Sequence, residues 1–339
     1  MAETIVLDFA EVKKHGFGLR MALTISAYTK QPIKITNFRA DDENKGLRWR
    51  DILYAGVIAN LGNVEMKGFD KKSTEVETNP KGILGGSKIV KVKNTISVSE
   101  LIVPAAMLSL GTKSRIRFMG PTDLDNLVAP EFIKYSTLSY LEKMGLKYDL
   151  AIIGKGFEEE GSLVLKNNTA ALPKNYSVLQ KGDLDTIKAY IHTTGYKTHV
   201  NDEIYTYAKQ RLMQTGKKIN FILEENKYIE NNVRNKGASM ALVAYYDNVT
   251  LCGCASGIKK TVPLIGKEAA DKIVGYLAKD FSIDSENAAI LLPFFCLTKK
   301  SEFVINKTSD KYNTAKYVCE KLFKKTIEFD KETRKVVIS

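Results

Sequence analysis

The chain has 339 residues, of which 51 are Lys or Arg and 39 are Asp or Glu, so its formal net charge is +12. Hydrophobic residues make up 44% and charged residues 27%, a balance that excludes disordered and collagen-like chains. No apolar run reaches the roughly 18 residues of a membrane span, and residues 1–5 lack the basic and apolar pattern of a signal peptide. We expect an intracellular protein of about two domains, with no membrane partner and a surface that favours a polyanion such as nucleic acid.

The first eighty residues predict two helices and four short strands in the order β-α-β-α-β-β. Apolar residues at helical spacing alternate with short runs of alternating or continuous apolar residues. Gly62 follows the second helix, at the position of a C-terminal cap. The expected strands are 5–9, 32–38, 64–67 and 74–78, and the expected helices are 17–28 and 47–61.

The same order returns twice, with corresponding elements about eighty residues apart in the first two units. In the second unit the expected strands are 88–93, 115–119, 148–153 and 162–166, and the helices are 98–110 and 132–144. In the third unit the expected strands are 177–180, 302–306, 327–329 and 335–338, and the helices are 285–297 and 313–323.

About 100 extra residues separate the first strand of the third unit from its first helix. They predict helices at 203–213 and 267–278 and strands at 219–223, 240–246 and 249–252. The expected fold class is therefore α+β, with three repeated β-α-β-α-β-β units, each a four-stranded sheet plus two helices, and an inserted smaller α+β domain. The expected domains are 1–181 with 282–339, and the insert 182–281; an ordinary α/β chain is the alternative.

Four cysteines do not assemble a metal site by their spacing. Cys252 and Cys254 are separated by one glycine, and neither a second cysteine pair nor a histidine lies close to them in the sequence. A zinc site needs four such ligands. We therefore expect buried free thiols and no metal.

Several segments together resemble the RNA 3'-terminal phosphate cyclase family, over essentially the whole chain. These are GLRMALTIS at 18–26, QPIKI at 31–35, NFRA at 37–40, KGLR at 45–48, MGPTD at 119–123, KMG at 143–145, ID at 283–284 and LLP at 291–293. The resemblance implies ATP-dependent cyclisation of an RNA 3'-phosphate, helped by metal, through a histidine that becomes adenylylated.

Most residues that this chemistry uses in the family are replaced here. The run KKHGF at 13–17 stands where the family has a glutamate, three glycines and a glutamine. Val103 stands at a glutamine position, and Ala289 and Ile290 stand at an Asp-Gln pair. Lys311 aligns with the nucleophilic histidine. The resemblance thus implies no catalytic residue, with Lys311 as the remaining candidate nucleophile, and no cofactor or metal.

The basic residues at the family's arginine positions are retained. Arginine binds phosphate through a planar fork of donors, so it suits an RNA backbone. A solvated rim with internal salt bridges to Asp41, Asp42 and Glu43 is the alternative interpretation. The predicted RNA- or anion-binding residues are Arg20, Arg39, Arg48, Arg50, Lys13 and Lys14.

The segments 83–87 and 39–44 resemble the eukaryotic RNA cyclase-like branch of the family. That branch implies a non-catalytic protein of small-subunit ribosome biogenesis and pre-rRNA processing. Its implied partners are pre-rRNA, a ribosome-assembly GTPase and other factors of the small-subunit processome. The implied location is the nucleolus or nucleus in a eukaryote and the cytoplasm otherwise.

Two other functions compete with this interpretation. The first is an active, divergent RNA 3'-terminal phosphate cyclase that uses ATP and Mg²⁺ to form 2',3'-cyclic phosphate ends. The second is a metal-dependent RNA nuclease, for which Asp41, Asp42 and Glu43 form the only compact acidic cluster in a site-like loop.

Overall fold

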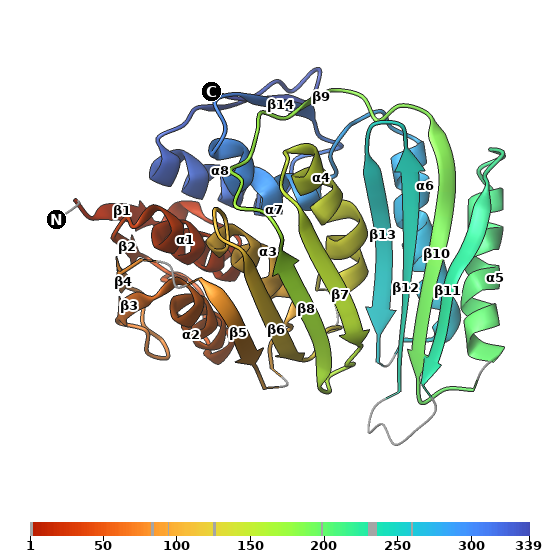
Figure 1. Ribbon diagram of the computed structural model, residues 1–339, viewed down its shortest axis with the longest axis horizontal. Helices are drawn as coiled ribbons and strands as arrows, with labels where there is room; N and C mark the ends of the chain where they lie inside the picture. The colour runs from red at the N-terminus through yellow and green to blue at the C-terminus, as the bar shows by residue number, and fades with distance from the viewer. Residues whose placement is uncertain are drawn as a thin grey trace.

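The computed structural model describes residues 3–82, 85–93, 95–124, 127–197, 199–229, 236–258 and 260–339. Residues 83 and 84 of the branch-like segment 83–87 lie outside this part. The described elements form four four-stranded sheets and the helices that cover them (Figure 1). The predicted α+β fold class is confirmed.

Three of the four sheets have the same topology, as the repeats predict. Their strand orders are β1-β2-β4-β3, β5-β6-β8-β7 and β9-β14-β16-β15. In each sheet the first two strands of that order are parallel and the others are antiparallel. A parallel pair needs a crossover connection, and a helix of the same unit supplies it in each repeat.

The elements of the first and second repeats follow the predicted order. The first repeat contains β1 (Ile5–Asp8), the turn η1 (Phe9–Glu11), α1 (His15–Thr29), β2 (Ile33–Thr36), α2 (Trp49–Gly62), β3 (Val64–Lys67) and β4 (Val76–Pro80). The second contains β5 (Gly86–Lys91), α3 (Ser99–Leu108), β6 (Ser114–Gly120), the π-helical turn η2 (Phe132–Thr137), α4 (Leu138–Lys143), β7 (Tyr148–Gly154) and β8 (Gly161–Asn167).

The third repeat is interrupted after its first strand. It contains β9 (Ser177–Val178), α7 (Ser285–Cys296), β14 (Ser301–Val304), α8 (Asp310–Phe323), β15 (Ile327–Phe329) and β16 (Lys335–Ile338). The helix α8 begins three residues earlier than predicted because the Ser309 hydroxyl caps it, accepting a hydrogen bond from the backbone N–H of Tyr312 at 3.1 Å.

Helices of the three repeats share one core. The helix α1 is buried on nearly all sides, from Gly18 to Ala27, which is typical of a helix surrounded by others. It packs against α2, α3 and α8, and α7 packs against α8 and α3. The N-terminal and C-terminal repeats therefore meet at α1 and α8, where the backbone N–H of Asp8 donates to the Tyr317 hydroxyl at 3.0 Å.

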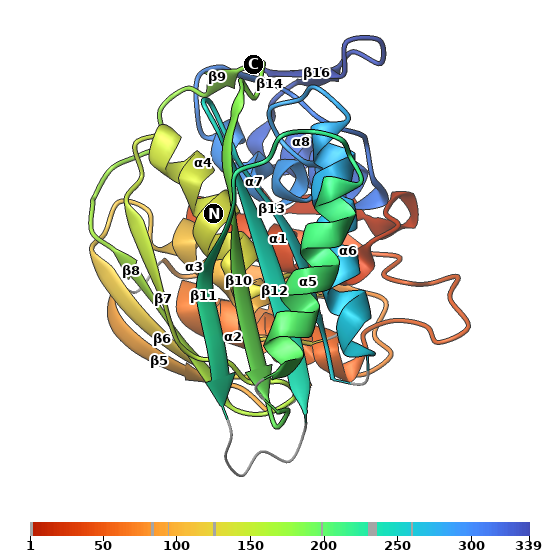
Figure 2. The same cartoon turned by 90° about the vertical axis from the view of Figure 1, so that its right-hand side faces the viewer.

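The segment between β9 and α7 builds the fourth sheet. Its elements are β10 (Leu184–Thr194), α5 (His199–Met213), β11 (Phe221–Ile229), β12 (Gly237–Tyr246), β13 (Thr250–Gly257) and α6 (Val262–Leu277), with strand order β11-β10-β12-β13. Figure 2 shows α5 and α6 together on one side of this sheet. On its other side η2 contacts β12 and β13. The predicted domain boundaries at 182 and 281 stay a prediction.

The sequence patterns missed β10, the longest strand of the described chain. Ten of its eleven residues are at least partly buried, and eight of the last nine are fully buried. A central strand covered on both faces carries no clear alternation of apolar and polar residues. The period-2 pattern that indicated β2 and β5 is therefore absent from it.

Candidate functional site

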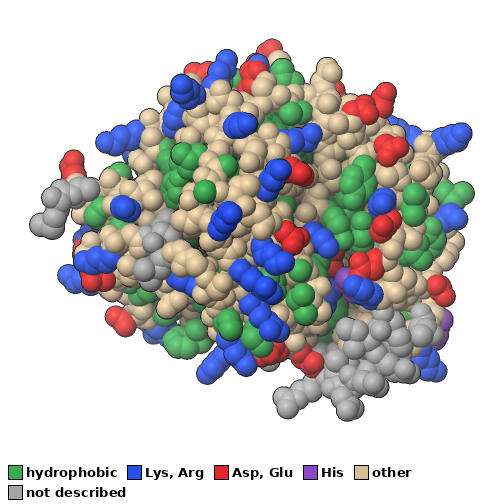
Figure 3. Space-filling view, viewed as in Figure 1, with side chains coloured by type: hydrophobic (Ala, Val, Ile, Leu, Met, Phe, Trp, Pro, Cys, Tyr) green, Lys and Arg blue, Asp and Glu red, His purple; other side chains and the backbone are tan. Residues whose placement is uncertain are grey.

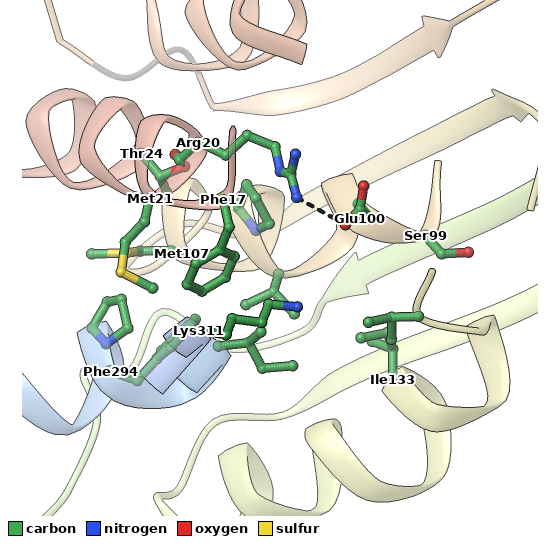
Figure 4. A pocket seen from close by; sticks show the side chains of 15 residues that line it. Phe17, Arg20, Met21, Thr24, Ser99, Glu100, Met107, Ile133, Phe294 and Lys311 are labelled. Atoms are coloured by element: carbon green, nitrogen blue, oxygen red, sulfur yellow. Dashed lines mark hydrogen bonds and ion pairs between the residues drawn. The ribbon is translucent and has the colours of Figure 1, made fainter. Parts of the chain in front are cut away.

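A largely apolar pocket lies where helices of all three repeats meet (Figure 4). Its wall comes mainly from α1, α3 and α7, and Lys311 enters it from the first turn of α8. Three of its apolar side chains, Phe17, Val103 and Ile290, stand where the resemblance implies polar nucleotide-binding groups. The pocket thus offers apolar surface with a few charged groups at one end, the composition of a small-molecule site.

An ion pair between repeats one and two forms the charged end of this pocket. The Arg20 Nη2 atom lies 2.8 Å from Glu100 Oε1, and the Tyr54 hydroxyl donates to Glu100 Oε2 at 2.7 Å. The Arg20 guanidinium also lies over the Tyr54 ring, 4.5 Å from its centroid. Burial acts to raise the pKa of Glu100, but the charge of Arg20 and the Tyr54 hydrogen bond outweigh it and lower that pKa. Glu100 is therefore held as a carboxylate at neutral pH.

Lys311 supplies the amine of the pocket. Its Nζ atom forms an ion pair with Glu286 Oε1 of α7 and lies 4.7 Å from the centroid of the Phe17 ring. Its charge also contributes to the lowered pKa of Glu100. The residue that aligns with the family's nucleophile is thus in the pocket, between two carboxylates.

The pocket opens into a larger polar cleft between the repeats and the fourth sheet. The two cavities share Phe17, Arg20, Glu100, Val128 and Lys311. The cleft adds basic side chains from α6 and from the loop before α8. Among its described lining residues seven are cationic (Lys14, Arg20, Lys260, Lys272, Lys279, Lys307, Lys311) and four are carboxylates (Glu100, Glu268, Asp271, Glu286). Such an excess of positive charge in a concave site attracts phosphate groups.

The first turn of α1 brings three of the predicted basic residues together. A Cβ atom placed on Gly16 would lie 3.4 Å from Arg39 Nη2, 4.0 Å from Arg20 Nη1 and only 2.8 Å from Asp51 Oδ1. The glycine therefore lets both guanidinium groups and Asp51 approach the helix, and Lys14 precedes it on the cleft wall. Arg39 is bound by Asp51, at 3.3 Å between Nη2 and Oδ1.

The other predicted basic residues lie at the rim. Lys13 is exposed and lies 3.6 Å from Asp310, and Arg48 lies 3.2 Å from Asp42. Arg50 is exposed, and its charge also contributes to the lowered pKa of Glu100. RNA contact by the six predicted basic residues stays a prediction. Arg20, Arg39 and Arg48 each already pair with a carboxylate of the chain, so RNA phosphates would compete with these ion pairs.

The acidic loop expected for a nuclease does not form a metal site. Asp42 is engaged by Arg48 and lies 3.9 Å from the Arg39 Nε atom, whereas Asp41 and Glu43 are exposed. Within the described ranges no group of three or more His, Cys, Asp and Glu side chains could hold a metal ion. The loop is better explained as a salt-bridged rim.

Sequence reasoning missed both carboxylates beside Lys311. Glu100 and Glu286 belong to helices of different repeats, and no local spacing links them to each other or to Lys311. Lys272 lies in α6, whereas Lys279 follows the end of that helix, so no shared helical face links these two cleft cations.

Positive charge is not confined to the cleft. Figure 3 shows Lys and Arg side chains gathered over the outer face of the sheet β5-β6-β8-β7. On that face Arg115 lies opposite Lys166, Arg117 lies opposite Val164, and Lys91 is paired with Glu160 at 3.1 Å. No helix that could span a membrane occurs among the residues that the structure describes.

The fold and the site together define a three-repeat α+β protein with a cationic cleft at the junction of its repeats. A model of the RNA 3'-terminal phosphate cyclase family matches residues 13–329, and the chain belongs to that family. It is similar to the protein named RNA 3'-terminal phosphate cyclase of Sulfurisphaera tokodaii, 27% identical over 282 residues and 82% of each chain. The chain is also similar to two further proteins with that name. The one from Saccharolobus islandicus is 28% identical over 286 residues and 82% of each chain, and the one from Sulfolobus acidocaldarius is 25% identical over 319 residues, 93% of this chain and 92% of the relative.

These relatives overturn the expectation of a non-catalytic protein of small-subunit ribosome biogenesis. All three are archaeal proteins named as cyclases, and they give no support to the eukaryotic branch, the nucleolar location or the processome partners. That expectation rested on the loss of the family's nucleotide-binding residues and of its histidine nucleophile. Lys311 keeps a nitrogen nucleophile inside the pocket, and lysine itself serves in covalent catalysis.

Proposed function

We propose that this chain is an ATP-dependent RNA 3'-terminal phosphate cyclase in which Lys311 carries the nucleotidyl group. Membership of the family over residues 13–329 supports the reaction. The observation that carries the proposal is the position of the Lys311 amine, in an apolar pocket that opens into a cleft with more cations than carboxylates. ATP would be the nucleotide substrate, and an RNA with a 3'-phosphate would be the acceptor.

The first step forms a bond between Lys311 and AMP. The Nζ lone pair attacks the α-phosphorus of ATP, the bond to the β-phosphate oxygen breaks, and pyrophosphate leaves. An amine attacks only as the free base, so its proton has to move. The Glu286 carboxylate, already bonded to Nζ, is the acceptor within reach. The cleft cations Lys14 and Arg20 would neutralise charge on the phosphates.

The second and third steps act on the RNA end. An oxygen of the RNA 3'-phosphate attacks the phosphorus of the Lys311-bound AMP, the P–N bond breaks, and Nζ recovers a proton from Glu286. The ribose 2'-hydroxyl then attacks the activated 3'-phosphorus and the P–O bond to AMP breaks. AMP leaves with the hydroxyl proton, and a 2',3'-cyclic phosphate remains. Both steps need the RNA end held beside Lys311, where the cleft is open and basic.

A Mg²⁺ ion would find few protein ligands in this cleft. Mg²⁺ at nucleotide sites commonly takes one or two carboxylates and completes its octahedron with phosphates and water. Glu100 and Glu286 are the carboxylates beside Lys311, and both are already bound by cations. Two such carboxylates are enough for an ion that is bound mainly by the phosphates of ATP, and too few for a site that binds the metal without the nucleotide. When bound, the ion would supply charge neutralisation on the phosphates.

The test is covalent labelling followed by product analysis. Wild-type protein incubated with α-labelled ATP and Mg²⁺ should retain label after denaturation, through an acid-labile P–N bond. Lys311→Arg and Lys311→Ala should retain none, whereas Lys316→Ala, on the same helix, should label as the wild type does. An RNA with a 3'-phosphate should gain a phosphatase-resistant end with the wild type alone. Absence of label and of cyclic ends with folded wild-type protein would overturn the proposal.

A further inference from the structure

Trp49 is the single tryptophan of the chain, and its side chain is largely exposed. It is 59% exposed at the first residue of α2. Isolated apolar residues are common on protein surfaces, so exposure alone carries no argument. A large aromatic ring flanked on both sides by arginines is a more specific arrangement, and Arg48 and Arg50 are both exposed here.

The start of α2 is not open to an anionic ligand, because a side chain of the same helix already binds a backbone N–H there. The Asp51 carboxylate accepts from the backbone N–H of Arg48 at 2.9 Å and closes a capping box. An anion at this helix end would compete with Asp51. What the turn offers is therefore its side chains, the indole face and the two guanidinium groups.

Arg50 connects this turn to the cleft. It lies four residues before Tyr54 on α2, so the two side chains share one side of the helix. Tyr54 reaches Glu100 on the cleft wall at 2.7 Å, and Arg50 is among the charges that lower the pKa of Glu100. Arg50 is thus both the neighbour of Trp49 in the sequence and the residue of this turn whose charge acts on Glu100.

The charges around Trp49 favour a polyanion. Arg48 is compensated by Asp42, at 3.2 Å, and the exposed acids Asp41 and Glu43 lie on the same loop. The cations of the same region are Arg50 and Lys45, together with Lys71 and Lys72. The backbone N–H of Lys72 donates to the Leu47 carbonyl at 2.9 Å, which holds these two lysines beside the loop. In these two segments the four cations outnumber the three exposed acids Asp41, Glu43 and Asp70.

We infer that Trp49 is a stacking platform for a base of single-stranded RNA, with Arg50 and Lys45 at the flanking phosphates. Single strands are bound by a basic track combined with aromatic rings on which bases stack, and any base has a face for stacking. This inference rests on the proposed function, because it extends the same RNA from the cleft onto the first repeat. It predicts binding without strong sequence preference.

The single tryptophan makes the test direct, because its fluorescence can be excited apart from that of the tyrosines. Single-stranded RNA with a 3'-phosphate should quench Trp49 fluorescence in low salt, and a duplex of the same length should not. By gel shift, Trp49→Ala should weaken binding roughly five- to a hundredfold. Trp49→Phe should keep most of the affinity, and Leu172→Ala, which removes a side chain of similar exposure (63%), should bind as the wild type does.

The same titration on Lys311→Ala protein separates the two proposals. Quenching there with no nucleotidyl label in the wild type would overturn the cyclase and support the stacking platform. Label in the wild type with no quenching would overturn the platform alone. The platform would also be overturned if RNA did not bind, if a duplex quenched the fluorescence equally, or if Trp49→Ala bound RNA with unchanged affinity. The exposed indole would then be a candidate contact for a protein partner.

Discussion

The Lys155 ammonium donates to both carboxylate oxygens of Glu131, at 2.8 and 2.9 Å, in a place where both side chains are almost fully buried. Lys155 also reaches Asp123 at 3.0 Å and the Ser239 hydroxyl of β12 at 2.8 Å. His192 of β10 lies 3.2 Å from Glu131. These contacts join the second repeat to the fourth sheet through charges, beside aromatic packing such as the stack of Tyr135 on Tyr190, with 4.4 Å between ring centroids. The orientation of one wall of the cleft therefore depends on them.

Replacing Lys155 with methionine should destabilise the protein strongly. The change keeps the volume but leaves Asp123 and Glu131 buried without their cation, which typically costs about 3–5 kcal/mol. The free energy of unfolding from urea denaturation at pH 7 measures it. Lys188→Met, which breaks an exposed pair with Glu224 at 2.9 Å, should leave the urea midpoint nearly unchanged. Equal losses in the two variants would contradict the structural role of the buried cluster.

Two glycines of α6 should respond oppositely to alanine. A Cβ atom on Gly266 would lie 2.2 Å from the Ile204 carbonyl oxygen of α5, so Gly266→Ala has to separate the two helices and should cost about 1–3 kcal/mol. A Cβ atom on Gly275 would meet nothing within 4 Å, so Gly275→Ala should be neutral or stabilise by up to about 1 kcal/mol. Thermal denaturation followed by circular dichroism compares them. A lower Tm for Gly275→Ala than for Gly266→Ala would refute the packing argument.

Asp284 should make part of the stability depend on pH. Burial raises its pKa to about 6, although its carboxylate accepts hydrogen bonds from the backbone N–H groups of Glu286 and Asn287 at 3.0 Å. In the unfolded chain an aspartate titrates near about 3.9. Between these two values the folded state binds a proton that the unfolded state does not, so this group stabilises the fold as the pH falls from 7 towards 4.

The check on Asp284 is a comparison of pH profiles. The free energy of unfolding of the wild type and of Asp284→Asn should be measured at pH 7 and pH 5. Other groups affect both proteins alike, so the difference between the two profiles isolates Asp284. The wild type should gain stability relative to the variant on acidification. Parallel profiles would show that the carboxyl titrates normally.

The cleft lysines should set the salt dependence of RNA binding under the proposed function. Neutralising one phosphate contact on a single strand lowers the magnitude of the slope of log K against log salt by about 0.7. Lys14→Gln and Lys307→Gln, both on the cleft wall, should each show this loss. Lys299→Gln, an exposed residue that is not among the described cleft-lining residues, should keep the wild-type slope. Identical slopes in all four proteins would place the RNA elsewhere.

The repeated architecture was open to prediction because each unit carries its own local signals. The apolar stripes of the helices and the alternation in short strands recur at similar spacing, and one such unit cannot bury its sheet alone. Of the two glycines expected behind the second helix of a unit, Gly145 does follow α4, whereas Gly62 is the last residue of α2 and Asn63 takes the left-handed cap. The strand β10 was not predictable in this way, because both of its faces are covered. The equally buried β12 was located because its residues form an apolar run, which lysine, histidine and threonine side chains interrupt in β10.

The site was only partly predictable because its charges come from distant segments. The alignment pointed to Lys311 and Arg20, but the carboxylates that engage them, Glu286 and Glu100, lie 25 and 80 residues away. Their contribution depends on helix packing between repeats, and no local spacing encodes it. The wrong function followed from the same limit, since replaced residues are visible in a sequence and newly assembled partners are not.

The place of the fourth sheet in the chain has a consequence for how the protein is made. Val178 of β9 pairs with Phe303 of β14, and α1 receives its partner α8 only from residues 310–323. A nascent chain emerges N-terminus first, so one side of α1 stays uncovered until residues 310–323 have left the ribosome. The helix α8 therefore completes the core that the repeats share, and removing it should expose the side of α1 that it covers.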